Sequence, residues 1–272
     1  MPLADQRGIP HHLVDVVGPA ERYSAADYSR DASAVVRAIL GRGRLPIVVG
    51  GTGLYFRALV RGMFPGPARD ERLRARLSHV AARRGVEALH RWLARVDPAS
   101  ARRIQPRDEK RIVRALEVYL LTGRPLTDHF DETTSPIEGV QVLTIGLSMP
   151  RPWLRERVAR RVAAQLARGV VGEVEALLRS GVPASAHAFS GLVYRQILEM
   201  LRGERDLEAT RELIIRENMR YARRQLIWFR KEPNVQWLEG PGEAEAAASE
   251  GKGLVTKFLG IEDCGIASMK ID

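Results

Sequence analysis

The sequence has few of the features that build disulfide-linked or membrane-spanning proteins. Of its 272 residues only Cys264 is a cysteine, which excludes an internal disulfide and any cysteine-rich zinc site. No window approaches the roughly eighteen unbroken apolar residues of a membrane-spanning helix. The N-terminus has no basic region followed by an apolar one, as a secretory signal would. We therefore expect a cytoplasmic protein without a membrane partner.

The usual short motifs of nucleotide-binding enzymes and hydrolases are also absent. The only Gly-Lys pair, Gly251-Lys252, is followed by Gly253 and has no glycine at the offset that the phosphate-binding pattern G-x-x-x-x-G-K-[ST] requires. H-E-x-x-H and G-x-S-x-G are missing as well. The 6 histidines are scattered, so no metal site is identifiable from metal-ligand spacing.

Positive charge is what the chain has in excess. It contains 43 Lys+Arg against 33 Asp+Glu, a net charge of +10, and arginine dominates the basic residues. Because the arginine fork matches the geometry of a phosphate, a polyanionic partner such as RNA is one interpretation. The alternative is a GC-rich genome whose codons favour arginine, and composition leaves both open.

The first part of the chain has the order of an α/β protein. Ser24 and Asp27 form a capping-box pattern that predicts the start of a helix. The apolar run Leu45–Val49 predicts a buried strand, and the glycine turn 50–53 closes it. Helix, strand, glycine turn and helix in succession are typical of a layer built on a parallel sheet.

The middle of the chain is predicted to be a helical insertion. Residues 70–95 and 108–122 show the periodicity of amphipathic helices, and a polar linker follows at 130–139. The chain then returns to strand at Val140–Leu147 and to helix after Pro150. We expect two parts of an α/β core, the helical insertion between them and a C-terminal tail of unknown role, with the order core, insertion, core and tail at 1–68, 69–138, 139–240 and 241–272.

The turn Gly50-Gly-Thr-Gly53 is the first candidate site. Ligands of open α/β sheets bind where a strand hands over to a helix, and the free N–H groups there attract phosphate. Gly50, Gly51 and Gly53 are therefore candidates for a phosphate-binding loop, and Thr52 adds a hydroxyl. The alternative is a simple glycine turn with a threonine cap.

Basic residues on predicted helices are the second set of candidates. Arg195 lies in the first turn of a helix, where it opposes the helix dipole, and a bound anion would remove that cost. Arg220, Arg223 and Arg224 share one face of a helix predicted over 206–230, and Lys110–Arg114 repeats the pattern in the insertion. The alternative for each is a solvated charged surface.

Six segments together carry a resemblance to a known family. They occur in the family's order: His11-His-Leu-Val-Asp15, Tyr23-Ser-Ala-Ala-Asp-Tyr28, Leu45-Pro-Ile-Val-Val-Gly-Gly-Thr-Gly-Leu-Tyr55, Lys110-Arg-Ile-Val-Arg-Ala-Leu-Glu-Val118, Tyr194-Arg-Gln196 and Tyr221-Ala-Arg-Arg-Gln-Leu-Ile-Trp-Phe-Arg230. Over about residues 7 to 240 the chain resembles the bacterial tRNA dimethylallyltransferases. Each segment alone is weak, but the combined spacing is highly specific.

This resemblance implies a reaction and a fold. The reaction is transfer of a dimethylallyl group from dimethylallyl diphosphate to N6 of the adenosine just 3′ of the anticodon, with the adenosine flipped out of its stack. The implied partners are the tRNA anticodon stem-loop and the diphosphate, with Mg²⁺ accompanying the latter. The implied fold is a P-loop kinase-like parallel sheet with an inserted all-helical tRNA-binding domain, in a monomer.

The resemblance also implies roles for single residues. Thr52 matches a threonine that contacts the target nucleotide and the diphosphate side of the channel. Arg195 matches the arginine that holds the departing pyrophosphate, whose growing negative charge suits a guanidinium. The remaining matches are tRNA contacts, at Arg74, Lys110, Arg111, Ile112, Val113, Arg114, Arg220, Arg223, Arg224 and Gln225.

The sequence departs from the family in three places. Family members open with a strand, a phosphate loop and a second strand bearing a general-base aspartate, none of which these residues contain. Val193 stands where the family has a glycine, which puts the placement of Arg195 in doubt, and Asn218-Met219 replaces a commoner Thr-Arg pair. The resemblance thus implies an N-terminally truncated chain with an incomplete core.

Three functional readings follow from these departures. The chain is a transferase that is inactive alone, a non-catalytic tRNA-binding fragment, or a prenyltransferase of free adenine nucleotides. The basic inserted helices argue against the third, since a small nucleotide needs no such platform. We also expect Ile47 and Val49 to be exposed and the chain to be unstable, while the helical insertion survives.

Overall fold

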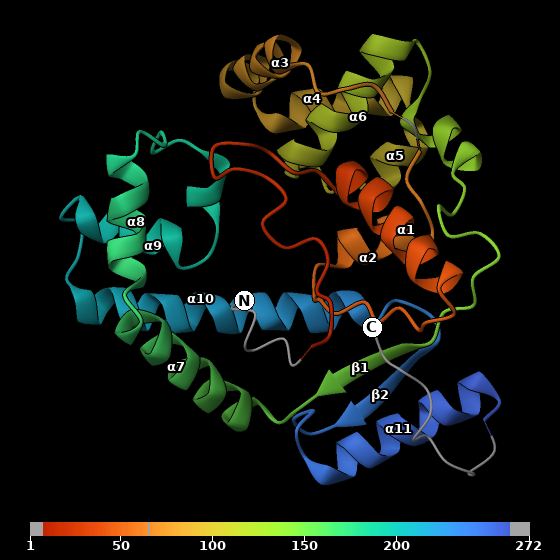
Figure 1. Cartoon of the computed structure of the whole chain (residues 1–272). Helices are drawn as coiled ribbons and strands as arrows, with labels where there is room; N and C mark the ends of the chain where they lie inside the picture. Colours follow the sequence, from red (N-terminus) through yellow and green to blue (C-terminus); the bar gives the residue numbers. More distant parts are fainter. Residues whose placement is uncertain (1–7, 65, 262–272) are drawn as a thin grey trace. The chain divides into compact units, whose positions relative to one another are not determined.

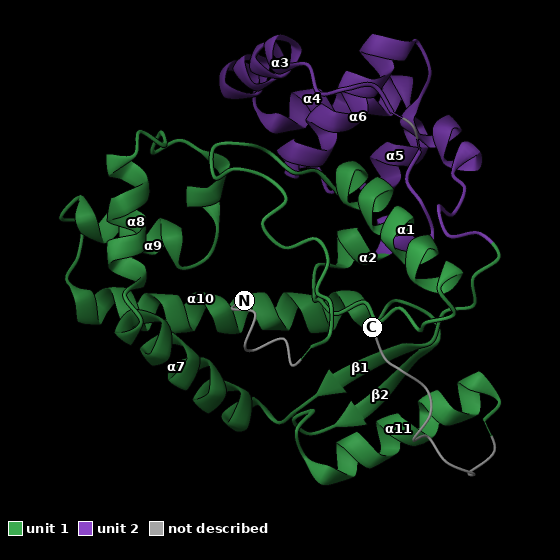
Figure 2. Cartoon of the chain, in the orientation of Figure 1, with its two compact units in different colours: residues 1–56, 139–272 green, residues 57–138 purple. Residues whose placement is uncertain are grey.

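The computed structural model describes residues 8–64 and 66–261, which form two compact units (Figures 1 and 2). One unit contains residues 57–138, and the other contains residues 1–56 and 139–272. Cys264 and the end of the tail lie outside the described residues. The second division agrees with the linker read from the sequence, but the first falls at Arg57 and not near residue 69.

Hydrogen bonds explain why the segment before residue 69 belongs to the helical unit. The Ser135 hydroxyl donates to the Val60 carbonyl at 2.8 Å, which ties the beginning of the unit to its end. The Arg114 guanidinium donates to the Pro67 carbonyl at 3.1 Å. These contacts join two segments distant in sequence, so sequence periodicity could not locate the boundary.

Among the described residues, the unit at 57–138 is all helical. Its elements are the end of α2 (Gly53–Val60), α3 (Glu71–Arg84), α4 (Val86–Val96), α5 (Pro98–Arg103), α6 (Glu109–Thr122) and a 3₁₀ helix, η2 (Leu126–Glu132). The single helix predicted over 70–95 is wrong, because Gly85 at φ +82° ends α3 and begins α4. A left-handed residue of this kind is a common helix stop.

The core of this unit is closed. Its most deeply buried side chains come from three of the helices and are Leu77, Leu89, Leu93, Ile112 and Leu116. Aspartates cap α3, α5 and α6 by accepting a main-chain N–H, which satisfies donors that a helix start leaves free. Local caps and helical periodicity therefore agree with the core.

The other unit combines helices with a small parallel sheet. It contains α1 (Ala25–Gly41), the start of α2, β1 (Thr144–Ser148), α7 (Arg151–Ala167), α8 (Val170–Arg179), η3 (His187–Ser190), α9 (Tyr194–Leu201), α10 (Leu207–Phe229), β2 (Val235–Glu239) and α11 (Glu245–Leu259). The two strands pair in register from Thr144 with Val235 to Ser148 with Glu239. The capping box at Ser24 and the helix over 206–230 are confirmed.

The predicted strand Leu45–Val49 is wrong. Apart from an isolated bridge at Leu45, this run is not in a strand, and the side chains of Ile47, Val48 and Val49 are 57%, 55% and 90% exposed. The expected exposure of Ile47 and Val49 is thus confirmed. A β-branched run has the propensity for a strand, but it forms one only where another strand's backbone lies alongside; the sheet of the described chain consists of β1 and β2.

The segment after residue 240, which carried little information in the sequence, forms a helix against the sheet. In Figure 1, α11 lies beside β2, and Leu238 of β2 is buried. Across the residues that the structure describes, every helix is too short or too polar to cross a membrane.

Candidate functional site

The glycine turn 50–53 packs directly on α10. The Gln225 side-chain amide donates to the Gly51 carbonyl at 2.8 Å. A Cβ at Gly51 would overlap that amide, and a Cβ at Gly53 would overlap the Trp228 ring. Glycine is therefore required at these two positions for the close approach of the turn to the helix.

Thr52 lies between these glycines and is exposed. Its carbonyl accepts the Phe56 N–H at 3.1 Å, which begins α2. Its hydroxyl has no hydrogen-bond partner among the described residues, so it does not act as a cap and is free to bind a ligand. The phosphate-binding interpretation of the turn therefore remains open, while the threonine-cap alternative is not what the structure shows.

Aromatic packing fixes the helix that follows Thr52. The Phe56 ring meets Trp228 edge to face at 6.2 Å and Phe229 at 5.6 Å. The Tyr55 ring stacks on Tyr28 of α1 at 4.5 Å, and its hydroxyl donates to the Tyr23 carbonyl at 3.1 Å. These contacts hold Thr52 between α1 and the C-terminal half of α10.

Arg195 lies in the first turn of α9, as the sequence predicts. Its side chain is 49% exposed, and its Nε lies 4.0 Å from a Glu199 oxygen, a loose contact on the same helix. Val193, just before the helix, has φ +77° and ψ −59°. For a β-branched residue this conformation is a genuine outlier, and it falls where the family has glycine.

The long helix α10 supports both candidate elements. Asn218 on α10 lines the same cavity as Tyr194 at the start of α9, and Gln225 bonds the glycine turn. These two positions on α10 are seven residues apart, about 10 Å along the helix axis. The turn that bears Thr52 and the helix that bears Arg195 are therefore placed by one rigid element.

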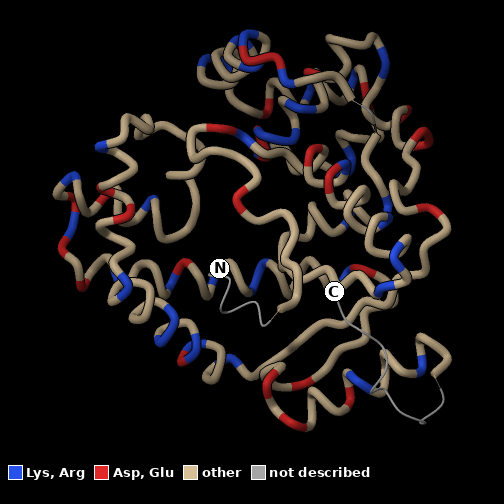
Figure 3. The backbone as a smooth tube through the Cα atoms, viewed as in Figure 1, with Lys and Arg blue, Asp and Glu red and all other residues tan. Residues whose placement is uncertain are grey.

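The predicted arginine face of α10 is on the surface. Arg220, Arg223 and Arg224 are all exposed, and Figure 3 shows basic positions along α10 and α7. Arg220 pairs with Glu217 at 2.6 Å, and the Arg224 guanidinium lies 5.6 Å from the Tyr221 ring centroid. In the described part of the chain, Arg223 and Arg224 have no acidic partner, so both are available to a polyanion.

The predicted contacts of the helical unit separate into two groups. Lys110 and Arg111 are exposed, and Arg111 meets only Asp108, at 3.4 Å. Ile112 and Val113 are buried in the core, so their side chains belong to the fold and not to a surface that RNA could contact. This corrects the assignment that their position in the motif suggested.

Arg74 and Arg114 are held by a buried carboxylate that the sequence gave no reason to single out. The Glu117 carboxylate accepts from Arg74 Nε and Nη2, both at 2.8 Å, and from Arg114 Nη1 at 2.6 Å. The main-chain N–H of Asp70 adds a bond at 2.9 Å. Although burial alone would raise the pKa of Glu117, these bonds lower it to about 2. Both arginines thus have a structural role.

The donors near the glycine turn do not form a magnesium site by themselves. Mg²⁺ is usually held by one or two carboxylates together with substrate phosphates. In residues 8–64 and 66–261 there is no cluster of three or more His, Cys, Asp or Glu side chains that could hold a metal ion. The exposed hydroxyl of Thr52 is an oxygen donor of the right kind, but one donor is not a site.

Comparison with known proteins identifies the class of protein that this fold and these motifs define. A family model described as IPP transferase matches residues 1–232. The chain belongs to the IPP transferase family.

Its relatives share most of their length with it. A tRNA dimethylallyltransferase of Geobacter sulfurreducens is 42% identical over 252 residues, which are 93% of this chain and 80% of the relative. A protein of the same name from Halorhodospira halophila is 49% identical over 223 residues, 81% of this chain and 72% of the relative. Their shared names place this chain among transferases.

Solved structures show the same fold. The tRNA isopentenylpyrophosphate transferase of Bacillus halodurans superposes with a TM-score of 0.64 at 32% identity, over 96% of this chain and 80% of that one. A eukaryotic dimethylallyltransferase acting on tRNA superposes with a TM-score of 0.76 at 23% identity, over 95% of this chain and 68% of the other. The helix-rich α/β fold with a small parallel sheet is thus that of tRNA isopentenyltransferases.

Proposed function

We propose that this protein acts in tRNA modification, by transfer of a dimethylallyl group from dimethylallyl diphosphate to N6 of the adenosine 3′-adjacent to the anticodon. The observation that carries the proposal is the seating of the Gly50–Gly53 turn on α10. That helix bears the exposed arginines and also packs against α9, which bears Arg195. Membership of the family and the names of its relatives support the same reaction.

In this proposal each element has a distinct chemical task. The amine nitrogen forms a bond to the first carbon of the dimethylallyl group, the carbon–oxygen bond to the diphosphate breaks, and the amine loses a proton. Arg195 neutralises the charge that grows on the departing diphosphate. The Thr52 hydroxyl orients the amine or a phosphate oxygen beside it.

RNA binding falls to the exposed cations. Arg220, Arg223 and Arg224 hold the backbone of the anticodon stem-loop in one unit, and Lys110 and Arg111 do so in the other. The Mg²⁺ ion enters with the diphosphate and supplies charge neutralisation there. We further propose that the protein works as a monomer in the cytoplasm.

A second candidate function is binding of tRNA without transfer. It is favoured by the absence of a G-x-x-x-x-G-K-[ST] pattern from the 272 residues, because such a loop is the usual cradle for a diphosphate. In this reading the three residues of the turn, Gly50, Gly51 and Gly53, serve packing alone. We propose that the 272 residues alone bind tRNA and do not turn over.

A transfer assay and a binding assay together separate these functions. The chain is incubated with labelled dimethylallyl diphosphate, Mg²⁺ and a tRNA that carries adenosine 3′ of its anticodon, and the matched control tRNA carries guanosine there. We expect the chain to prefer the adenosine tRNA in binding and to transfer no label. Turnover would establish the transferase and exclude the binding-only function. Equal affinity for both tRNAs would contradict recognition of the adenosine.

A further inference from the structure

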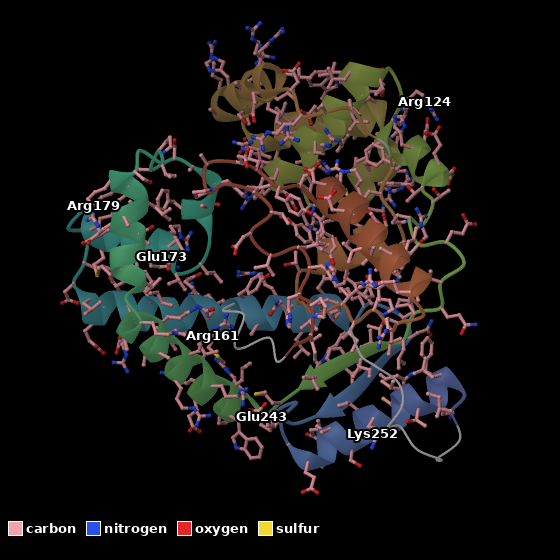
Figure 4. All side chains as sticks on the ribbon, in the orientation of Figure 1. Arg124, Arg161, Glu173, Arg179, Glu243 and Lys252 are labelled. Carbon is pink, nitrogen blue, oxygen red and sulfur yellow. The ribbon has the colours of Figure 1, made fainter. Side chains whose placement is uncertain are left out.

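A cavity of about 400 Å³ lies within the unit formed by residues 1–56 and 139–272, apart from the side chain of Arg195. Its walls come from α7 and its C-cap, the start of α8, the start of α9 and the middle of α10. Figure 4 labels two of the lining side chains, Arg161 from α7 and Glu173 from α8. The polar residues that line it are Arg161, Gln165, Arg168, Glu173, Tyr194 and Asn218.

The cations of this cavity lack acidic partners. Arg161 and Arg168 are exposed, and within the described ranges neither makes an ion pair. Other arginines of α7 differ: Arg160, for example, lies 3.6 Å from Glu156. Two unpaired guanidinium groups at one cavity favour an anion, and the arginine fork suits a phosphate in particular.

Two helix starts add to the positive character of the walls. Helix α8 begins after Gly169 and helix α9 after Val193, and neither residue has a side chain that can accept the first N–H groups. Both helix starts contribute lining residues, Val170 for α8 and Tyr194 for α9. Free N–H groups and the helix dipole at such starts attract anions.

Glu173, the acid among the lining residues, is occupied by a neighbour. The Tyr194 hydroxyl donates to its carboxylate at 2.5 Å. Burial and this bond raise the pKa of Tyr194 to about 12, so the phenol keeps its proton at neutral pH. The bond holds Glu173 to α9, and with two arginines opposite one carboxylate the lining keeps a net positive charge.

The backbone beside the cavity is strained and incompletely bonded. Val193, a lining residue, has the positive φ already described, and its N–H donates to Gln196 Oε1 at 2.7 Å. Gln196 is fully buried, yet its Nε2 has no hydrogen-bond partner in the part of the chain that the structure describes. Strain and an unsatisfied buried donor are features that folded proteins retain mainly at functional sites.

We propose that this cavity is a binding site for a phosphate group, held by Arg161 and Arg168 and distinct from Arg195. The proposal rests on the proposed function in so far as that reaction supplies two sources of the group, the tRNA backbone and a free diphosphate. Arg161, Arg168 and the two helix starts recognise either one. The experiment therefore has one arm for each source.

The test compares two double variants of the full chain. R161Q/R168Q removes the lining cations, and R155Q/R160Q removes two exposed arginines of the same helix that do not line the cavity. The first arm measures tRNA affinity over a series of KCl concentrations. The second measures the thermal midpoint of each protein with inorganic phosphate or pyrophosphate, against chloride at equal ionic strength.

We expect R161Q/R168Q to differ from the control in at least one arm. Loss of a backbone contact lowers the slope of log affinity against log salt by about 0.7 to 0.9 for each phosphate released, which would assign the site to tRNA. Loss of the thermal shift with pyrophosphate, with an unchanged salt slope, would assign it to a small phosphate. Identical behaviour of both double variants in both arms would overturn the proposal.

The two arms also separate this proposal from the proposed function. If the parent chain binds no tRNA, the proposed function fails, and the pyrophosphate arm still decides the cavity. If the parent binds tRNA and the two double variants behave alike in both arms, only the cavity proposal fails.

Discussion

Residues 57–138 and the rest of the described chain bury their large apolar side chains to different degrees. In the helical unit the most exposed ones, Leu120, Leu121 and Phe130, are 42% exposed. In the other unit Val49 is 90% exposed, and Trp153 of α7 is 58% exposed. Exposed apolar surface of this kind is a liability for aggregation or a place for a partner to bind.

The difference shows which unit can stand alone. In 57–138 every core helix finds its partners within the same 82 residues, from Arg57 to Glu138. In the other unit, the run Leu45–Val49 has the composition of a buried strand without a strand beside it. The helical unit therefore supplies its own stability, and the α/β unit has apolar surface left over.

The largest expected effect is a difference in autonomous folding. Residues 57–138 produced alone should unfold in one cooperative denaturant transition, because their ends are already joined by the Ser135–Val60 bond. The full chain should show a second, broader transition or aggregate on heating. The measurement is urea unfolding followed by circular dichroism. A non-cooperative transition of the excised unit would contradict the comparison.

Within the helical unit, Glu117→Gln should have the largest single effect. It removes a fully buried charge on which Arg74 and Arg114 converge, and breaking such a pair costs about 3 kcal/mol of unfolding free energy. The control is Glu87→Gln, whose exposed partner Arg107 makes the pair worth less than about 1 kcal/mol. Equal losses in the two variants, measured by urea unfolding of residues 57–138, would show that the Glu117 network is not structural.

The same network makes the helical unit sensitive to acid. Because the pKa of Glu117 is lowered from 4.5 to about 2 in the folded state, its stabilisation is fully present above pH 4.5 and is lost as the pH falls toward 2. The loss should be on the order of 3 kcal/mol. Urea unfolding between pH 6 and 2 measures it, and the Glu117→Gln variant should lack this part of the pH dependence.

Local signals in the sequence were reliable where short-range contacts decide the structure. The capping box at Ser24, the helix around Arg195 and the start of β2 at Val235 all depend on neighbours in sequence. Leu45–Val49 failed because strand formation depends on a partner distant in the chain. Within residues 70–95 the break at Gly85 was missed, since apolar periodicity continues across it.

The candidate site shows the same division. The sequence indicated the glycine turn and the α10 arginines, but the overlap of a Cβ at Gly53 with Trp228 depends on a contact between residues 175 positions apart. Glu117 lay unnoticed in a quoted motif. An acid three residues after Arg114 on a helix is the signal that could have found it. The cavity at Arg161 is formed by four helices and has no signature in sequence.

The turn on α10 offers a sharper test within the less complete unit. Gly53→Ala forces a Cβ into the Trp228 ring and should cost about 1 to 3 kcal/mol, as overpacking does. It should also lower tRNA affinity, because Thr52 moves with the turn. Gly50→Ala is the matched control, since its Cβ would meet open space. Equal melting temperatures and affinities of the two variants would show that the turn is not seated on α10.

The smallest effect on stability, and the most direct on the comparison, is expected from surface substitutions. Ile47→Ser with Val49→Ser should change the unfolding free energy by less than about 0.5 kcal/mol, because both side chains are largely in water. Aggregation, measured by light scattering on heating, should nonetheless fall. Leu120→Ser with Leu121→Ser in the helical unit is the control, and it should reduce scattering less. If the control pair has the larger effect, the apolar surface that drives association lies on the helical unit, and the contrast between the two units is reversed.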